Sequence, residues 1–237
     1  MGTAIIVEDL RKRYDDVQAV DGASFDVKVG EIFGMVGPNG AGKTTTIECI
    51  EGLRRPDGGV IRVLGLDPGS EAEELRLRIG VQLQESNLPD RLRVREALEL
   101  FGSFYPSAEP PDELLVLLGL EEKHRAPWGK LSGGQKQRLF IALALINRPE
   151  VVFLDELTTG LDPQARRHMW DLVQGIREQG RTVFLTTHFM EEAERLCDRV
   201  ASWIKGGSSR WTARPGSSDP WGWSGDSHSP LNRAART

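Results

Sequence analysis

A glycine-rich loop that ends in a lysine and a threonine restricts the possible folds of this chain more than any other feature of its sequence. It follows an apolar run at residues 31–36 and precedes a helical pattern at residues 45–53; its residues are Gly37, Pro38, Asn39, Gly40, Ala41, Gly42, Lys43 and Thr44. In this spacing the glycines let backbone N–H groups and the helix N-terminus point at phosphate oxygens. Lys43 adds positive charge near the β- and γ-phosphates, and the Thr44 hydroxyl is a candidate ligand for Mg²⁺. This phosphate loop, with Thr45 after it, predicts a nucleoside triphosphate site.

Two consecutive carboxylates end a second apolar run, at residues 151–154. A continuous apolar run is typical of a parallel strand covered on both faces, so Asp155 is expected at the carboxyl edge of a sheet, where it can hold Mg²⁺ through water. Glu156 then faces the attacking water as a candidate general base. For these two residues alone, a solvated acidic turn is the alternative. Together with the phosphate loop they indicate a P-loop NTPase.

The order of the expected elements indicates an α/β protein with an open sheet. Residues alternate in polarity at 23–29 and 60–64, as in half-buried strands, whereas residues 182–185 form another apolar strand. Apolar residues at helical spacing, interrupted by two prolines, indicate a helical insertion at about residues 86–130. Alternating strands and helices predict a sheet whose ligands bind beyond the carboxyl ends of its strands.

The overall composition argues against several classes of function. A formal net charge of −5 provides no basic face for nucleic acid. The two cysteines, Cys49 and Cys197, lack the spacing of a metal site, and no secretory signal pattern is present, so a cytoplasmic protein is expected. Apolar runs such as residues 141–146 are far shorter than the roughly 20 residues that cross a bilayer. We therefore expect no nucleic-acid partner, and a role at a membrane only through another protein.

A further glycine motif distinguishes among the P-loop NTPases. The sequence Leu131-Ser132-Gly133-Gly134-Gln135 precedes a helical pattern, Ser132 suits a helix N-cap, and the glycines allow a phosphate to come close. It resembles the LSGGQ signature of the ATP-binding cassette (ABC) family. The resemblance implies that Ser132, Gly133, Gly134 and Gln135 bind the γ-phosphate of ATP held by a second chain, so that a head-to-tail dimer completes each site. An ordinary capped helix is the alternative.

The resemblance extends to four further positions. Tyr14 stands where the family stacks an aromatic side chain on adenine, with a core role as the alternative. Gln84 resembles the glutamine that contacts Mg²⁺ and the attacking water, with Gln82 as an alternative alignment. Asp162 lies in a segment like the loop that links the two sites, and it also suits a helix N-cap. His188 resembles the histidine that reaches the γ-phosphate.

The resemblance covers residues 3 to about 201, and its nearest type is the daunorubicin-resistance-like, multidrug-export ATPase of bacteria. It implies an N-terminal antiparallel β subdomain beside the open α/β sheet. It also implies a subunit that hydrolyses ATP with Mg²⁺, pairs with itself or another ABC subunit, and drives an integral membrane permease from the inner face of the cell membrane. Leu157 departs from the pattern, because the family normally has proline after the catalytic glutamate.

One alternative function is that of a soluble ABC protein acting on ribosomes or DNA, which typically has two cassettes or coiled-coil arms. A P-loop kinase, the other rival, has no use for a signature helix.

The composition changes abruptly after Ala201. Residues 202–237 contain four of the six tryptophans and no valine, phenylalanine or glutamate, and no strand pair like that of the family is visible in them. Permitted codons for residues 201–215, read in another frame from the third base of the Ala201 codon, spell IVDQGRIVALDSPA, two apolar strands around a glycine turn. We therefore expect a nucleotide-binding domain at residues 1–201 and an aberrant, disordered tail at 202–237, caused by a single-base deletion in the gene or its sequencing. A genuine disordered extension is the alternative. The strand edge beside the tail is expected to be open.

Overall fold

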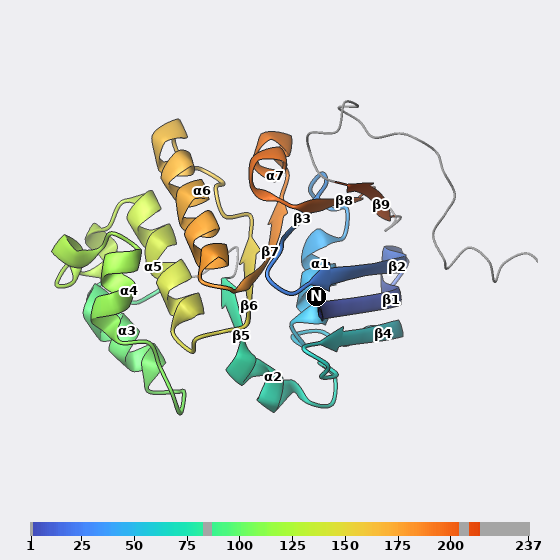
Figure 1. Cartoon of the computed structure of the whole chain (residues 1–237), viewed down its shortest axis with the longest axis horizontal. Helices are drawn as coiled ribbons and strands as arrows, with labels where there is room; N and C mark the ends of the chain where they lie inside the picture. The colour runs from blue at the N-terminus through green and yellow to red at the C-terminus, as the bar shows by residue number, and fades with distance from the viewer. Residues whose placement is uncertain (1, 83–86, 204–208, 214–237) are drawn as a thin grey trace, which may run out of the picture.

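The computed structural model of the protein places residues 2–82 and 87–203, and the backbone of residues 209–213. Two sheets form its framework (Figure 1). The first is antiparallel and has the order β2-β1-β4; its strands are β1 (Thr3–Tyr14), β2 (Val17–Lys28) and β4 (Gly58–Val63). In β2 every second side chain from Ala23 to Val27 is buried, so the alternation in the sequence marks the face that meets the core. The N-terminal antiparallel sheet predicted from the sequence is confirmed.

The second sheet contains the strands that position the site. Its order is β5-β6-β7-β3-β8-β9, and every neighbouring pair is parallel except β8 with β9. The strands are β3 (Ile32–Val36), β5 (Ile79–Gln82), β6 (Val151–Asp155), β7 (Thr182–Thr187), β8 (Arg199–Trp203) and β9 (Ser209–Ala213). Because β3, β6 and β7 are neighbours, their carboxyl ends meet at one edge, as the predicted open α/β sheet requires.

The apolar strands are continuous in sequence because each of their faces meets a different core. In β3, Ile32 and Val36 join one cluster of buried side chains, whereas Phe33 and Met35 join the other. The second cluster also contains residues of the antiparallel sheet and of α1 (Lys43–Ile50). The first contains residues of α5 (Gly133–Leu145), α6 (Pro163–Glu178) and α7 (Met190–Leu196), among other helices, and these three lie on the side away from β1, β2 and β4 (Figure 1). Successive side chains of these strands therefore pack into opposite layers of the protein.

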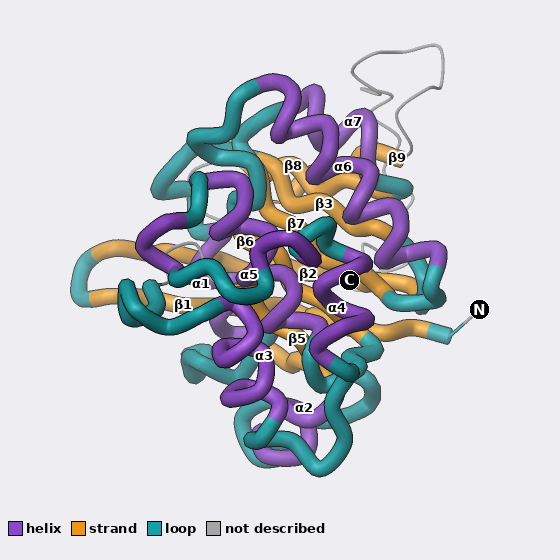
Figure 2. The backbone as a smooth tube through the Cα atoms, turned by 90° about the vertical axis from the view of Figure 1, so that its left-hand side faces the viewer, coloured by secondary structure: helices purple, strands orange, loops and turns teal. Residues whose placement is uncertain are grey.

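A group of helices lies between β5 and β6 in the chain. It comprises α3 (Val94–Gly102), α4 (Pro111–Leu117) and two short 3-10 turns (Glu121–Lys123 and Trp128–Lys130), and both α3 and α4 pack against α5 (Figure 2). Helix α2 (Ala72–Arg78) precedes β5. The apolar side of α3 supplies Val94, Ala97 and Leu98 to the core, which explains their helical spacing. Across the part of the chain that the structure describes, no helix combines the length and the apolar composition needed to cross a membrane.

The structure corrects the expectation of an open edge after Ala201. Strand β8 continues to Trp203 and pairs with β3, and β9 then pairs with β8 in antiparallel register. Trp203 is 1% exposed and forms a T-shaped contact with the Phe25 ring at a centroid distance of 6.0 Å. Val200, Ala201 and Trp203 are all buried, and this burial with the backbone pairing holds the strand in place. Residues 204–208 and 214–237, on which the rest of the tail prediction falls, lie outside the described residues.

Candidate functional site

The phosphate loop connects the carboxyl end of β3 to the first residue of α1. Gly40 and Gly42 have φ of 77° and 100°, a backbone conformation that favours glycine. A Cβ atom at Gly42 would also collide with the carbonyl oxygen of Ala19, so no larger residue fits there. Helix α1 begins at Lys43 without a side-chain cap. Its N-terminus therefore offers the positive end of the helix dipole to an anion.

Lys43 is buried at the centre of this loop. Its side chain is 4% exposed, and its ammonium donates hydrogen bonds to the carbonyl oxygens of Gly37 at 2.8 Å and Pro38 at 3.2 Å. Burial lowers the pKa of Lys43, while the nearby charges of Glu156 and Asp155 oppose that shift. The charge is thus held against the loop by carbonyls that phosphate oxygens can replace.

The two carboxylates lie where β6 ends, beside β7. Asp155 is directly opposite Thr186, whose hydroxyl donates a hydrogen bond to Asp155 Oδ1. The next backbone N–H, that of Glu156, donates to the carbonyl oxygen of the same threonine at 3.1 Å. Thr186 was not among the residues predicted from the sequence, because its contact depends on the order of the strands. To predict this contact, one would have to know that β6 and β7 are neighbouring strands whose ends lie side by side.

Lys43, Glu156 and His188 are brought together from three different strand ends. The Lys43 Nζ atom lies 3.8 Å from Glu156 Oε1, and His188 Nδ1 lies 3.6 Å from Glu156 Oε2. The side chain of Glu156 is 6% exposed and that of His188 is 30% exposed. These predicted site residues therefore share one partly open cluster with Asp155.

The turn that carries Glu156 has an unusual backbone. Glu156 has φ of 49°, in the left-handed region that non-glycine residues seldom adopt. The following residue, Leu157, is 2% exposed and belongs to the larger apolar cluster. A proline at 157 would restrict the backbone of the residue before it, and leucine imposes no such restriction. Leu157 thus imposes no restriction on the backbone of Glu156, and packing in the apolar cluster fixes the Leu157 side chain.

The charges of this cluster suit a divalent cation and a nucleotide. Burial raises the pKa of Asp155, the negative charge of Glu156 raises it further, and the hydrogen bond from Thr186 lowers it. One buried ammonium faces two buried carboxyl groups, so a cation would relieve the excess of negative charge. Oxygen ligands of the kind that Mg²⁺ prefers are present in Asp155 and Thr44. The residues in place therefore fit Mg²⁺ bound together with phosphates.

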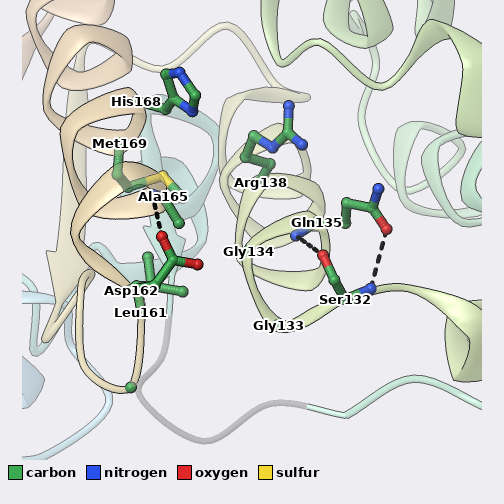
Figure 3. Close-up of a pocket in the computed structure, with 11 residues that line it drawn as sticks. Ser132, Gly133, Gly134, Gln135, Arg138, Leu161, Asp162, Ala165, His168 and Met169 are labelled. Atoms are coloured by element: carbon green, nitrogen blue, oxygen red, sulfur yellow. Dashed lines mark hydrogen bonds between the residues drawn. The ribbon is translucent and has the colours of Figure 1, made fainter.

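The signature residues form a separate hollow of about 250 Å³ between α5 and α6 (Figure 3). Ser132 caps α5: its hydroxyl accepts a hydrogen bond from the Gln135 N–H at 3.3 Å, and the Gln135 side chain accepts one from the Ser132 N–H at 3.0 Å. The predicted N-cap is confirmed. The hollow is lined by residues of two segments, 132–138 and 160–169, and by none of the phosphate loop. Its opening is therefore distinct from the Lys43 cluster.

Asp162 lies on the opposite wall of this hollow and caps α6 (Figure 3). Its Oδ1 atom accepts hydrogen bonds from the backbone N–H groups of Gln164 and Ala165, both at 2.9 Å. The cap predicted for Asp162 is thus present. His168 and Arg138 complete the rim, and Arg138 donates to the carbonyl oxygens of Leu118 and Gly119 at 2.9 Å.

The remaining predicted residues lie away from these two clusters or outside the described chain. Tyr14 is half-buried at the end of β1, with the Arg54 guanidinium 5.1 Å and the Lys12 ammonium 5.6 Å from the centre of its ring. Gln84 is outside the described residues. Gln82, the alternative alignment, is 3% exposed at the end of β5. The roles assigned to Tyr14 and Gln84 therefore stay predictions.

The fold and the two glycine motifs define a class of protein. The sequence model of the family described as "ABC transporter" matches residues 20–159, more than half of the chain. The chain belongs to the ABC transporter family.

Relatives and solved structures agree with this assignment. The chain is 48% identical over 197 residues to the Nod factor export ATP-binding protein I of Burkholderia orbicola (strain AU 1054), covering 81% of this chain and 65% of that protein. Identity to the protein of the same name from Rhizobium meliloti is 47% over 202 residues, covering 83% of this chain and 60% of that one. The chain thus spans less than two thirds of the length of these curated relatives.

Two solved cassettes share the fold. An ATP-binding cassette of an ABC transporter in its ADP conformation superposes with a TM-score of 0.81 at 23% identity, covering 91% of this chain and 92% of that one. A dimeric structure of a bacterial ABC transporter cassette superposes with a TM-score of 0.79 at 27% identity, covering 88% and 98%. The expected ABC cassette fold, with its antiparallel sheet beside a parallel α/β sheet, is confirmed.

Proposed function

We propose that this chain is the ATP-hydrolysing subunit of an ABC exporter and that it works in pairs to power a separate membrane permease. Its 48% identity to a protein named for Nod factor export supports a role in export. The daunorubicin-resistance-like type is the exporter class that the sequence resembles. The nucleotide-binding unit extends from β1 through β8, and it acts from the cytoplasmic face of the membrane against the permease.

Binding of ATP depends first on the phosphate loop and α1. The backbone N–H groups of residues 39–45 cradle the phosphates, and the Lys43 ammonium exchanges its loop carbonyls for β- and γ-phosphate oxygens. Tyr14 stacks on the adenine ring. Thr44, Asp155 and Gln84 would hold Mg²⁺, which when bound neutralises charge on the phosphates.

Hydrolysis is an attack by water on the γ-phosphate. Glu156 takes the proton of that water, and its carboxylate is kept in place by the contacts with Lys43 and His188. His188 is exposed enough to reach the γ-phosphate from the end of β7. Most of the rate enhancement comes from positioning and from neutralising charge, as in other phosphoryl transfers.

The separation of the signature hollow from the Lys43 cluster is the observation that carries the proposal. Ser132, Gly133, Gly134 and Gln135 line a hollow without any residue of the phosphate loop. A helix N-terminus with two glycines is suited to a phosphate, and here that phosphate has to come from another chain. A head-to-tail pair supplies it and completes two sites at once, with Asp162 beside the junction. The similarity to a dimeric cassette supports this arrangement.

The proposed activity is tested by replacing Lys43 with alanine. The loss of a buried charged hydrogen bond costs about 1.5–3 kcal/mol of binding. We expect steady-state ATP turnover by purified Lys43→Ala to fall to background, with Lys123→Ala, an exposed lysine outside both clusters, as the matched control. A Lys43→Ala variant that keeps more than half of the turnover would contradict the assignment of the phosphate loop.

A further inference from the structure

Helices α6 and α7 pack side by side, and two pairs of side chains connect them (Figure 1). In the inner pair, the indole N–H of Trp170 donates a hydrogen bond to Glu192 Oε1 at 3.2 Å, and both residues are buried. In the outer pair, one turn earlier in each segment, the Arg166 guanidinium lies over the Phe189 ring, 4.6 Å from its centre. Because the buried hydrogen bond fixes the two helices relative to one another, the fold also sets the position of Arg166 over Phe189.

The Phe189 ring also contacts the imidazole of His188. The two ring centres are 4.0 Å apart, and the ring planes are inclined at 40°. The Phe189 N–H donates a hydrogen bond to Thr187 Oγ1 at 3.0 Å, which fixes the backbone of this turn but not the torsions of the His188 side chain. The His188 side chain is 30% exposed, and its Nδ1 atom lies 3.6 Å from Glu156 Oε2. A partly exposed imidazole depends on such flanking contacts to keep one rotamer.

Arg166 belongs to the first turn of α6, where its backbone N–H donates to the carbonyl oxygen of Asp162 at 2.9 Å. Its Nε atom is buried and has no hydrogen-bond partner among the described residues. A guanidinium has five N–H donors, which usually bond carboxylates or carbonyls. A cation held over an aromatic face is attracted by the negative face of the ring. The contact with Phe189 is therefore the principal interaction of the Arg166 side chain.

We propose that Arg166 is a positioning residue of the hydrolytic site. By holding the Phe189 ring, it fixes the orientation of the His188 imidazole beside Glu156. Without the cation, the Phe189 ring is free to change rotamer, and His188 then loses a flanking contact and turns away from the γ-phosphate more often. The role of His188 in hydrolysis rests on the proposed function; the contact that orients its ring does not.

Nuclear magnetic resonance of the full chain, labelled in its four histidines and free of nucleotide, tests the contact itself. The ring current of Phe189 shifts the His188 ring signals, which His188→Ala assigns, and Phe189→Leu gives their position without that ring. At about pH 8.5, where histidines are neutral, Arg166→Ala should move the His188 signals toward the Phe189→Leu position. Arg166→Lys, which keeps a cation, should restore most of the wild-type shift. Arg167→Ala, at an exposed arginine next to it on α6, should leave the His188 signals unchanged.

Steady-state ATP turnover tests the consequence for hydrolysis. Arg166→Ala is expected to lower kcat about fivefold, the size of one cation–π contact, while KM for ATP stays within about twofold of the wild type. Arg166→Lys should recover most of the lost kcat, and Arg167→Ala should match the wild type. Combined with His188→Ala, Arg166→Ala should lower kcat no further, because it acts only through the imidazole.

Two results would overturn the proposal. One is a set of His188 signals that is the same in Arg166→Ala as in the wild type. The other is a loss of kcat from Arg166→Ala that is as large in the presence of His188→Ala as in its absence. If Arg166→Ala does not fold, Arg166→Gln, which keeps a long side chain without the charge, takes its place in both tests. Because the resonance comparison contains no ATP, it is independent of the turnover test of Lys43→Ala, and either can fail without the other.

Discussion

At the scale of single residues, the region around the nucleotide site buries more acidic side chains than basic ones. Asp155 is 5% exposed and Glu51 is 3% exposed, and the negative charge of Asp155 helps to raise the pKa of Glu51. Lys43 is the buried cation beside Asp155 and Glu156. Such an arrangement lowers the stability of the ligand-free protein and favours the binding of a cation.

The buried carboxyl group of Glu51 makes the stability of the protein depend on pH. Its pKa in the folded protein is about 8, raised from 4.5, so the folded state holds the proton more tightly than the unfolded state does. The resulting stabilisation is complete below about pH 4.5 and is lost as the pH rises to about 8. We expect the free energy of unfolding of the wild type to fall by up to about 5 kcal/mol relative to Glu51→Gln over this interval.

Urea unfolding at pH 5 and pH 8.5 measures that difference. Glu73→Gln, at an exposed acid on α2, serves as the control and should follow the wild type at both values. Parallel pH profiles for the wild type and Glu51→Gln would mean that the carboxyl group is solvated or paired, contrary to its burial in the structure.

Residues within one continuous motif could be predicted from the sequence, whereas those that depend on strand order could not. The phosphate loop, the Asp155–Glu156 pair and the caps at Ser132 and Asp162 are local patterns, so spacing was sufficient. The contact of Thr186 with Asp155 and the burial of Glu51 arise from neighbours distant in the chain. A glutamate near a helix end is usually solvated, and nothing nearby in the sequence signals otherwise.

At the scale of elements, the caps of α5 and α6 shape the signature hollow. Asp162 satisfies two N–H groups of the first turn of α6, a helix of 16 residues. Asp162→Ala is expected to lower the free energy of unfolding by about 1 kcal/mol, and Asp162→Asn by much less, because asparagine is also a good N-cap. Urea midpoints of the three proteins check this. An Asp162→Ala midpoint equal to that of the wild type would show that the Asp162 cap does not stabilise the protein.

The reading frame that encodes strands β8 and β9 can also be tested. The backbone pairing of β8 with β3 requires an extended segment but not a particular sequence, so the encoded residues and the shifted-frame string IVDQGRIVALDSPA can each supply it. We propose a single-base deletion near the codon of Ala201. Resequencing the gene should then show bases that encode this string in the shifted frame, and stop codons or polar codons there would rule the deletion out.

At the scale of the whole molecule, the proposed pairing gives each chain the halves of two different sites. The Lys43 cluster lies at the ends of β3, β6 and β7, and the signature hollow lies between α5 and α6 (Figures 1 and 3). The overall α/β fold followed from alternating strands and helices in the sequence. How the two halves face one another across a pair of chains is a property of the assembly, and no local pattern encodes it.

The assembly is tested most directly by Glu156→Gln. Glutamine keeps the size and hydrogen-bonding ability of the side chain but cannot accept the proton of the attacking water, so ATP should bind and stay intact. Size-exclusion chromatography with light scattering, in the presence of ATP and Mg²⁺, should then show dimers for Glu156→Gln and monomers for the same protein without nucleotide. Glu156→Gln that carries bound ATP and still elutes as a monomer would contradict the central claim that two copies of this chain enclose the nucleotide.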